Sequence, residues 1–273
     1  MRQFVVDAFT DRVFAGNQAA ICLVDVWPSD DLMKAIAREN NFSETAFLLP
    51  LRRGDTAGEQ SGDAAAPDYA LRWFTPGGEI DLCGHATLAS SFVVCELLEP
   101  GRGRVTFGTM SGALPVSRSG DLYEMDFPAF ELRPVAVSEA IESALGCHVS
   151  EAWLGRDLLC VLDDEKTVRE LAPDQDPLKE LDGLLCHVTV RGHGPYDCVS
   201  RSFAPKLDVA EDPVCGSGHC HILPYWSRRL GTSALLAYQA SARGGEIQGK
   251  VHGDRVTLGG KAVLFSTAEL AIG

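Results

Sequence analysis

Two short stretches, Leu82-Cys83-Gly84-His85-Ala86 and Val214-Cys215-Gly216-Ser217-Gly218, decide the fold. Each places Cys-Gly in front of small and apolar residues, a pattern typical of a helix that is buried on all sides. The two cysteines lie 132 positions apart, which is close to half the chain and is the spacing that a duplicated lobe would give. The sequence therefore predicts an α/β (α+β) protein with two pseudo-symmetric lobes, each a curled sheet around a central helix.

The segments around these two helix starts alternate between strand and helix patterns. Ser29 is placed to cap a helix that ends near residues 40–41, and two more helices are expected at 138–145 and 177–181. Residues 54–67 are rich in Gly, Ala, Asp and Ser and predict a loop. Alternating apolar residues predict strands at 4–8, 19–24, 46–49, 69–74, 104–107, 123–127, 152–161, 186–191 and 196–203, the first two as a hairpin.

The chain length of 273 residues fits two compact lobes. A proline-containing stretch at 127–134 suggests a crossover, so we expect an N-terminal lobe at 1–127 and a C-terminal lobe at 128–273. A last strand near 262–273 is expected to return to the first lobe. The active site is expected between the lobes.

The composition limits the partners and the compartment. A formal net charge of −14 disfavours nucleic acid and anionic membranes, while a local cluster of N–H groups or an arginine can still bind a small anionic substrate. Nine scattered cysteines do not resemble the disulfide framework of a small secreted domain. No signal peptide or long apolar run is present in the sequence, so we expect a cytoplasmic location.

The glycines at the two helix starts predict a substrate-binding role. N–H groups at the N-terminal ends of two helices would hold a carboxylate, and Gly84, Gly216 and Gly218 would let a substrate approach the backbone closely. Helix packing is the alternative explanation, and it is slightly favoured for Gly218.

Four side chains are candidates for acid–base chemistry or substrate recognition. Glu44 lies between a helix end and an apolar strand, where burial would raise its proton affinity, although such a residue is far more often a solvated surface group. His85 could act near neutrality or simply hold structure. Asp212 could form an Asx turn or transfer a proton, and Ser217 could cap its helix, bind a substrate oxygen, or do both.

The run His219-Cys220-His221 contains zinc-ligand residue types. Consecutive helical side chains point in different directions and cannot easily converge on one ion, so no metal site is predicted. The other histidines are isolated in the sequence and receive no predicted role: His148, His187, His193 and His252.

Four separated blocks together resemble the signature of the PhzF-like isomerase family of phenazine biosynthesis, and the likeness covers essentially the whole chain. The resemblance implies a diaminopimelate epimerase-like fold, no cofactor, a homodimer, and a proton moved on a small carboxylate-bearing metabolite. The family's acid–base glutamate falls on Glu44, its Gly-His pair on Gly84 and His85, and its remaining site residues on Asp212 and Ser217. The blocks are Asp7-Ala8-Phe9-Thr10 with Gly16-Asn17, then Asn41-Phe42-Ser43-Glu44-Thr45-Ala46-Phe47, Leu82-Cys83-Gly84-His85-Ala86-Thr87 and Asp212-Pro213-Val214-Cys215-Gly216-Ser217.

Two departures from the family pattern leave alternatives open. Gln18 stands where the family often has proline, and Cys215 stands where many members have threonine. With Cys83, both positions of the catalytic thiols of diaminopimelate epimerase and proline racemase carry cysteine. A two-thiol amino-acid epimerase or racemase that uses Cys83 and Cys215 is therefore the first alternative. A non-catalytic metabolite-binding protein is the second.

Overall fold

The computed structural model describes residues 1–51 and 66–272, so most of the loop expected at 54–67 lies outside the described residues. The chain divides into two compact units. Unit 1 comprises Met1–Phe14, Gln18–Asp126 and Gly260–Gly273, and unit 2 comprises Ala15–Asn17 and Phe127–Gly259. Within the described residues, no helix has the length and apolar character needed to cross a membrane.

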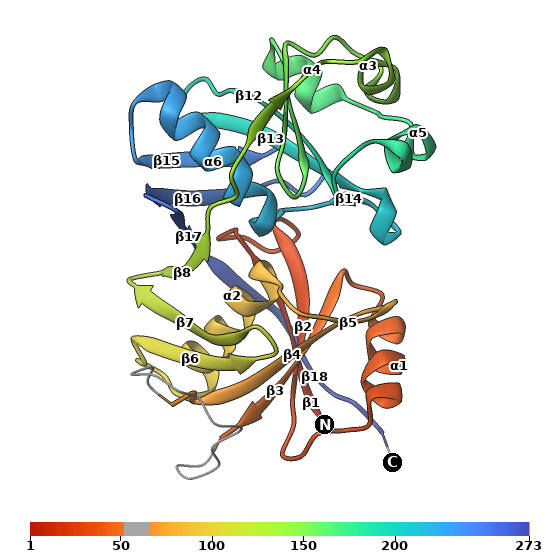
Figure 1. The fold of residues 1–273 in the computed structure, drawn as a ribbon. Helices are drawn as coiled ribbons and strands as arrows, with labels where there is room; N and C mark the ends of the chain where they lie inside the picture. The colour runs from red at the N-terminus through yellow and green to blue at the C-terminus, as the bar shows by residue number, and fades with distance from the viewer. Residues whose placement is uncertain (52–65, 273) are drawn as a thin grey trace. The chain divides into compact units, whose positions relative to one another are not determined.

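Unit 1 contains a mixed, mostly antiparallel set of strands (Figure 1). β1 (Arg2–Ala8) pairs with β2 (Asn17–Leu23) and runs antiparallel to β18 (Ala262–Glu269), while β2 runs parallel to β3 (Glu44–Pro50). β4 (Tyr69–Thr75) lies antiparallel to β3 and to β5 (Gly78–Ile80), and parallel to β6 (Arg104–Thr109). β7 (Gly112–Ser119) then joins β6 to β8 (Leu122–Pro128) in an antiparallel meander.

Two of these strands were not predicted from the sequence. β5 has only three residues, and β7 contains Pro115, a residue type that is depleted in strands because it cannot donate a ladder hydrogen bond. The other strands expected in this unit are confirmed within a few residues.

Helix α1 (Asp30–Asn40) confirms the capping prediction. Ser29 is extended, and its Oγ accepts a hydrogen bond from the N–H of Leu32. Asn41 ends the helix in the left-handed conformation, which asparagine tolerates well. The buried face of α1 consists of Met33, Ile36 and Ala37.

Helix α2 (Gly84–Phe92) is the buried helix of unit 1. Its residues from His85 to Ser91 are all buried, and it contacts β1, β3 and β18. Cys83 is still extended, so the helix begins at Gly84, and it continues as a π-helix, η1 (Val93–Leu98). The position of Cys83 directly before α2 places His85 at the second residue of the helix.

Unit 2 contains its own mixed set of strands. Antiparallel pairs join β9 (Arg133–Val135) to β10 (Glu151–Leu154), and β10 to β11 (Leu158–Val161). β12 (Cys186–Arg191) runs parallel to β11 and antiparallel to β13 (Cys198–Ala204). β13 also pairs with β14 (Val209–Asp212) and, in parallel, with β15 (Ala234–Gln239). β16 (Gly245–His252) and β17 (Arg255–Gly260) complete the set in antiparallel register.

Helix α6 (Gly216–Leu230) is the counterpart of α2. It contacts β12, β15 and β16, and its residues from Gly218 to Trp226 are buried. Gly231 ends it with φ of 67°, a left-handed conformation that favours glycine.

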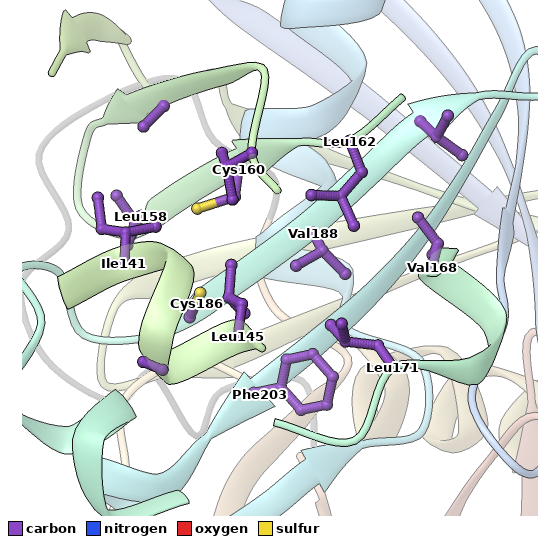
Figure 2. Packing of buried hydrophobic residues seen from close by; sticks show 14 of the residues in the cluster. Ile141, Leu145, Leu158, Cys160, Leu162, Val168, Leu171, Cys186, Val188 and Phe203 are labelled. Carbon is purple, nitrogen blue, oxygen red and sulfur yellow. The ribbon is translucent and has the colours of Figure 1, made fainter. Parts of the chain in front are cut away.

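The short helices of unit 2 cover a separate apolar cluster (Figure 2). α3 (Glu139–Leu145) is capped by Ser138 as predicted, and α5 (Gln175–Glu180) overlaps the helix expected at 177–181, whereas α4 (Glu165–Glu170) was not predicted. In this cluster, helix side chains pack on side chains of β11, β12 and β13. The helices contribute Ile141, Leu145, Val168 and Leu178, and the strands contribute Leu158, Cys160, Val188 and Phe203.

One turn in unit 2 lies at the functional site. Residues 152–161, where strands were expected, form β10 and β11. The turn between them contains Gly155, Arg156 and Asp157. The backbone therefore reverses direction at these three residues.

Candidate active site

The centre of the candidate site in unit 1 is a contact between Glu44 and His85. Glu44 is the first residue of β3, and His85 is the second residue of α2. Glu44 Oε2 lies 2.9 Å from His85 Nε2, and the two side chains are only 15% and 6% exposed. The alternative of a solvated Glu44 on the surface is therefore not what the structure shows.

Packing around the start of β3 holds Glu44 in this position. Thr45, the next residue, is fully buried, and its Oγ1 accepts a hydrogen bond from Asn40 Nδ2 at 3.0 Å. Because successive strand side chains point to opposite faces, burial of Thr45 fixes the opposite direction for Glu44. The end of α1 and the start of β3 thus set the direction of the carboxylate.

Cys83 also contacts the imidazole ring. Its Sγ lies 3.6 Å from His85 Nδ1, so both a thiol and a carboxylate contact the ring. Burial lowers the pKa of His85, but the nearby Cys83 and Glu44 outweigh it and leave the pKa well above its usual value. Burial also raises the pKa of the Cys83 thiol, which keeps this group protonated near neutrality.

Glu44, Cys83 and His85 bring three metal-ligand types together, with ligand atoms within 4.8 Å of one another. The carboxylate lies 2.9 Å from Nε2 and the thiol 3.6 Å from Nδ1 of the same ring. These three side chains could therefore hold a metal ion as well as exchange protons, although the sequence predicted no metal site here.

At the start of α6 in unit 2, Cys215 is the capping residue. Its Sγ accepts a hydrogen bond from the N–H of Gly218 at 3.3 Å. The expected cap by Ser217 is wrong, because Ser217 is already the second helical residue. Burial raises the pKa of the Cys215 thiol well above its usual value, as nearby Asp212 also does.

The turn before α6 is held by buried polar side chains. Asp212 Oδ1 accepts hydrogen bonds from the N–H of Val214 at 3.1 Å and from Asn17 Nδ2 at 2.8 Å. Gln239 bridges the same turn, since its Nε2 donates to the Asp212 carbonyl and its Oε1 accepts from the N–H of Cys215. Asp212 therefore has the Asx-turn contact that the sequence allowed, which gives it a structural role at this helix start.

Arg243 anchors the same turn region. Its Nε donates to the carbonyl of Gly16 at 2.8 Å, and its Nη2 donates to the carbonyl of Ala15 at 2.9 Å. Gly16 has φ of 66°, so the left-handed conformation explains the glycine before Asn17.

A buried polar network under α6 was missed in the sequence analysis. The fully buried Asp157 carboxylate accepts two hydrogen bonds from Arg156, at 3.0 and 2.6 Å, and lies 3.1 Å from His187 Nε2. These partners hold the pKa of Asp157 far below its usual value despite burial, which alone would raise it. Arg156 Nη2 also donates to Ser217 Oγ at 3.0 Å, so the network reaches the helix start.

His187 is thus not an isolated histidine. It is fully buried, and its Nδ1 lies 2.9 Å from Ser202 Oγ. A Cβ added to Gly218 would lie 2.7 Å from His187 Cε1, which is closer than real Cβ atoms come. Close packing on His187 therefore explains Gly218, in line with the packing alternative.

The histidines of α6 do not form a shared site with Cys220. His219 Nδ1 lies 2.7 Å from the Cys215 carbonyl, and burial lowers its pKa to about 4. His221 turns towards Asp157, whose N–H donates to His221 Nε2 at 3.3 Å, and burial lowers the pKa of His221 to about 3. Asp157, His187 and His221 also have metal-ligand types close together, but this hydrogen bond already occupies the lone pair of the His221 ring.

Comparisons with known proteins cover nearly the whole chain. The family model described as phenazine biosynthesis-like protein matches residues 6–268. An uncharacterized isomerase of Pseudomonas aeruginosa is 46% identical over 270 residues, which cover 98% of this chain and 97% of the relative. Phenazine biosynthesis-like domain-containing protein 1 of Mus musculus is 38% identical over 283 residues, with 96% of each chain covered.

Solved structures give the same result for the fold. A PhzF-family phenazine biosynthesis protein from Enterococcus faecalis has a TM-score of 0.90 and 43% identity, with 99% of each chain covered. A hydroxyproline epimerase from Agrobacterium vitis has a TM-score of 0.60 at 12% identity, covering 98% of this chain and 91% of the epimerase. The second similarity shows a shared fold alone, and the expected epimerase-like α/β class is confirmed.

Proposed function

This chain belongs to the phenazine biosynthesis-like protein family, and on that basis we propose that it is a cofactor-independent isomerase. The proposed reaction moves a proton on a small carboxylate-bearing metabolite. The isomerase class agrees with the names of relatives from Pseudomonas aeruginosa and Halalkalibacterium halodurans. The observation that carries the proposal is the half-buried Glu44 carboxylate, 2.9 Å from His85 Nε2.

In the proposed reaction, Glu44 is the acid–base group. Its carboxylate takes a proton from a substrate C–H bond, and the electron pair of that bond moves into the conjugated system of the substrate. The protonated Glu44 then returns the proton to another carbon, so that atoms and charge balance. His85, whose pKa is raised, lies with Nε2 2.9 Å from the Glu44 carboxylate, where its positive charge stabilises the negative charge that develops nearby.

Solvent deuterium exchange tests this proposal. A substrate that turns over in D2O should gain deuterium at carbon, and Glu44→Gln should abolish the exchange because an amide cannot take up the proton. Glu39→Gln, at an exposed position of α1, is the matched control and should exchange at the wild-type rate. Normal exchange in Glu44→Gln would refute the role of Glu44.

The two-thiol epimerase remains the second candidate. Its support is that Cys83 and Cys215 both stand at the N-cap positions of buried helices. Against it, burial raises the pKa of both thiols, so neither is a ready thiolate base in the free protein. Loss of exchange in Cys83→Ala or Cys215→Thr, with normal exchange in Glu44→Gln, would favour the thiol mechanism.

Other parts of the proposal have separate tests. No exchange across a broad panel of cyclic and α-amino acids would favour metabolite binding without catalysis.

Asp212, Gly84, Gly216 and Ser217 keep their proposed roles in catalysis or substrate binding, to be tested by substitution. The homodimer implied by the resemblance predicts twice the chain mass of 29.4 kDa in light scattering. Nine scattered cysteines, unlike the disulfide framework of a small secreted domain, support a reducing, cytoplasmic compartment.

A further inference from the structure

The guanidinium group of Arg156 is held rigidly by three kinds of contact in unit 2. Nε and Nη2 donate to the two oxygens of Asp157, whose side chain is fully buried. The group also lies 4.8 Å from the centre of the Phe130 ring, within range of a cation–π contact. Nη2 donates a second hydrogen bond, to Ser217 Oγ. An arginine held in this way has already lost most of its side-chain freedom.

One edge of this guanidinium has no bonding partner. Nε and Nη2 make all the hydrogen bonds of Arg156 to the described residues, so both N–H groups of Nη1 are unused there. The Arg156 side chain is 33% exposed, so a small molecule can reach it. Nη2 uses both of its N–H groups, so the free donors are those of Nη1, and one of them can donate a single charge-assisted hydrogen bond to a carboxylate oxygen.

The hydroxyl of Ser217 is directed by the same contact. Because Ser217 Oγ accepts from Arg156 Nη2, its own proton is available for another acceptor. Cys215 Sγ, at 3.5 Å, is the neighbouring acceptor in the protein, and thiol sulfur is a weak one. An oxygen of a bound anion would be a better acceptor for this proton.

We propose that Arg156 and Ser217 together bind the carboxylate of the substrate, with Asp157 and His187 as positioning residues that hold the guanidinium. This assignment deepens the proposed function, because it names the group by which the substrate is recognised. It makes Arg156 a specificity-determining residue. The charge of Asp157 offsets that of Arg156, so recognition depends on the direction of the N–H groups more than on net charge.

Binding of matched probe pairs tests the inference without turnover. Anthranilate and aniline differ only in the carboxylate, as do pyrrole-2-carboxylate and pyrrole, and calorimetry gives the dissociation constant of each. The wild type should prefer the acid in each pair. Arg156→Met and Arg156→Lys should reduce that preference about tenfold to a hundredfold, the range for a lost charge-assisted hydrogen bond.

The two variants and one control make the result decisive. Arg156→Met removes two donors from buried Asp157 and could impair folding, whereas Arg156→Lys keeps a positive charge there but lacks the planar pair of nitrogens. Arg169→Met is the matched control, because Arg169 also contacts a carboxylate, Glu165, and an aromatic ring, Tyr238. Its preference for the acids should equal that of the wild type.

Failure of this inference is distinguishable from failure of the proposed function. No preference for either acid in the wild type, or an unchanged preference in folded Arg156→Lys, would overturn the role of Arg156. Deuterium exchange that depends on Glu44 would in that case still support the isomerase. Conversely, Arg156-dependent binding without exchange would leave the carboxylate site standing and remove the proposed reaction.

Discussion

Substitution of Gly218 by alanine tests the packing between α6 and the buried network of unit 2. The new Cβ would lie 2.7 Å from His187 Cε1 and 2.9 Å from Nδ1 of the same ring. The ring cannot move aside easily, because it is fully buried and held by Ser202 at 2.9 Å and Asp157 at 3.1 Å. One methyl group must therefore displace the ring or the helix.

Two opposing effects set the magnitude. Overpacking of a buried site costs about 1–3 kcal/mol, and disturbing a hydrogen bond of His187 adds about 1 kcal/mol. Alanine in place of glycine inside a helix contributes about 1 kcal/mol of stabilisation. We expect Gly218→Ala to lower the free energy of unfolding by about 2 kcal/mol.

The assay is urea unfolding followed by circular dichroism, in two backgrounds. In His187→Ala the ring is absent, so adding Gly218→Ala should there increase stability relative to His187→Ala alone. Gly103→Ala is the control, because a Cβ at Gly103 meets nothing within 4 Å. Stabilisation by Gly218→Ala in the wild-type background, or the same loss in both backgrounds, would refute the reasoning.

Three further predictions concern charge, thiols and capping. Asp157→Asn should cost about 2 kcal/mol near neutrality, below the usual value for a broken buried pair because Arg156 is one-third exposed. The folded-state pKa of Asp157 is depressed, so the stability that its carboxylate contributes is present above about pH 4 and declines as the pH falls below that value. A difference in free energy of unfolding between wild type and Asp157→Asn that grows in acid would contradict the account. Of the nine cysteines, only Cys147 is not buried, so Ellman's reagent should modify one thiol quickly, and Cys147→Ser should remove that phase; fast reaction of Cys83 or Cys215 would count against their being protonated and buried. Cys215→Ala should cost about 1 kcal/mol in urea unfolding through loss of the cap, whereas Cys215→Thr should restore it; equal losses in both would show that the sulfur does not cap α6.

The central helices could be predicted because their sequences are unambiguous. Mostly small and apolar residues follow Cys83 and Cys215, and such runs bury well as helices. Ser29 and Ser138 are equally readable, because a capping side chain acts on N–H groups only three residues away. Local rules suffice where the interaction itself is local.

The network around Asp157 could not be predicted in the same way. His187 lies 30 residues further along the chain and Ser217 another 30, and no periodicity relates the three positions. A local signal did exist, since Gly155, Arg156 and Asp157 have the composition of a turn. Such a signal places a turn, but it does not say which distant side chains the turn will meet.

The protonation state of His85 tests the central claim most directly. The Glu44 carboxylate, 2.9 Å from Nε2, favours the charged form of His85, whose pKa is raised, so at pH 7 both ring nitrogens should carry protons in nitrogen-15 NMR of labelled protein. In Glu44→Gln the pKa should fall and the ring should lose a proton, whereas Glu39→Gln should leave the spectrum unchanged. A neutral His85 ring at pH 7 in the wild type would contradict the proposed acid–base pair.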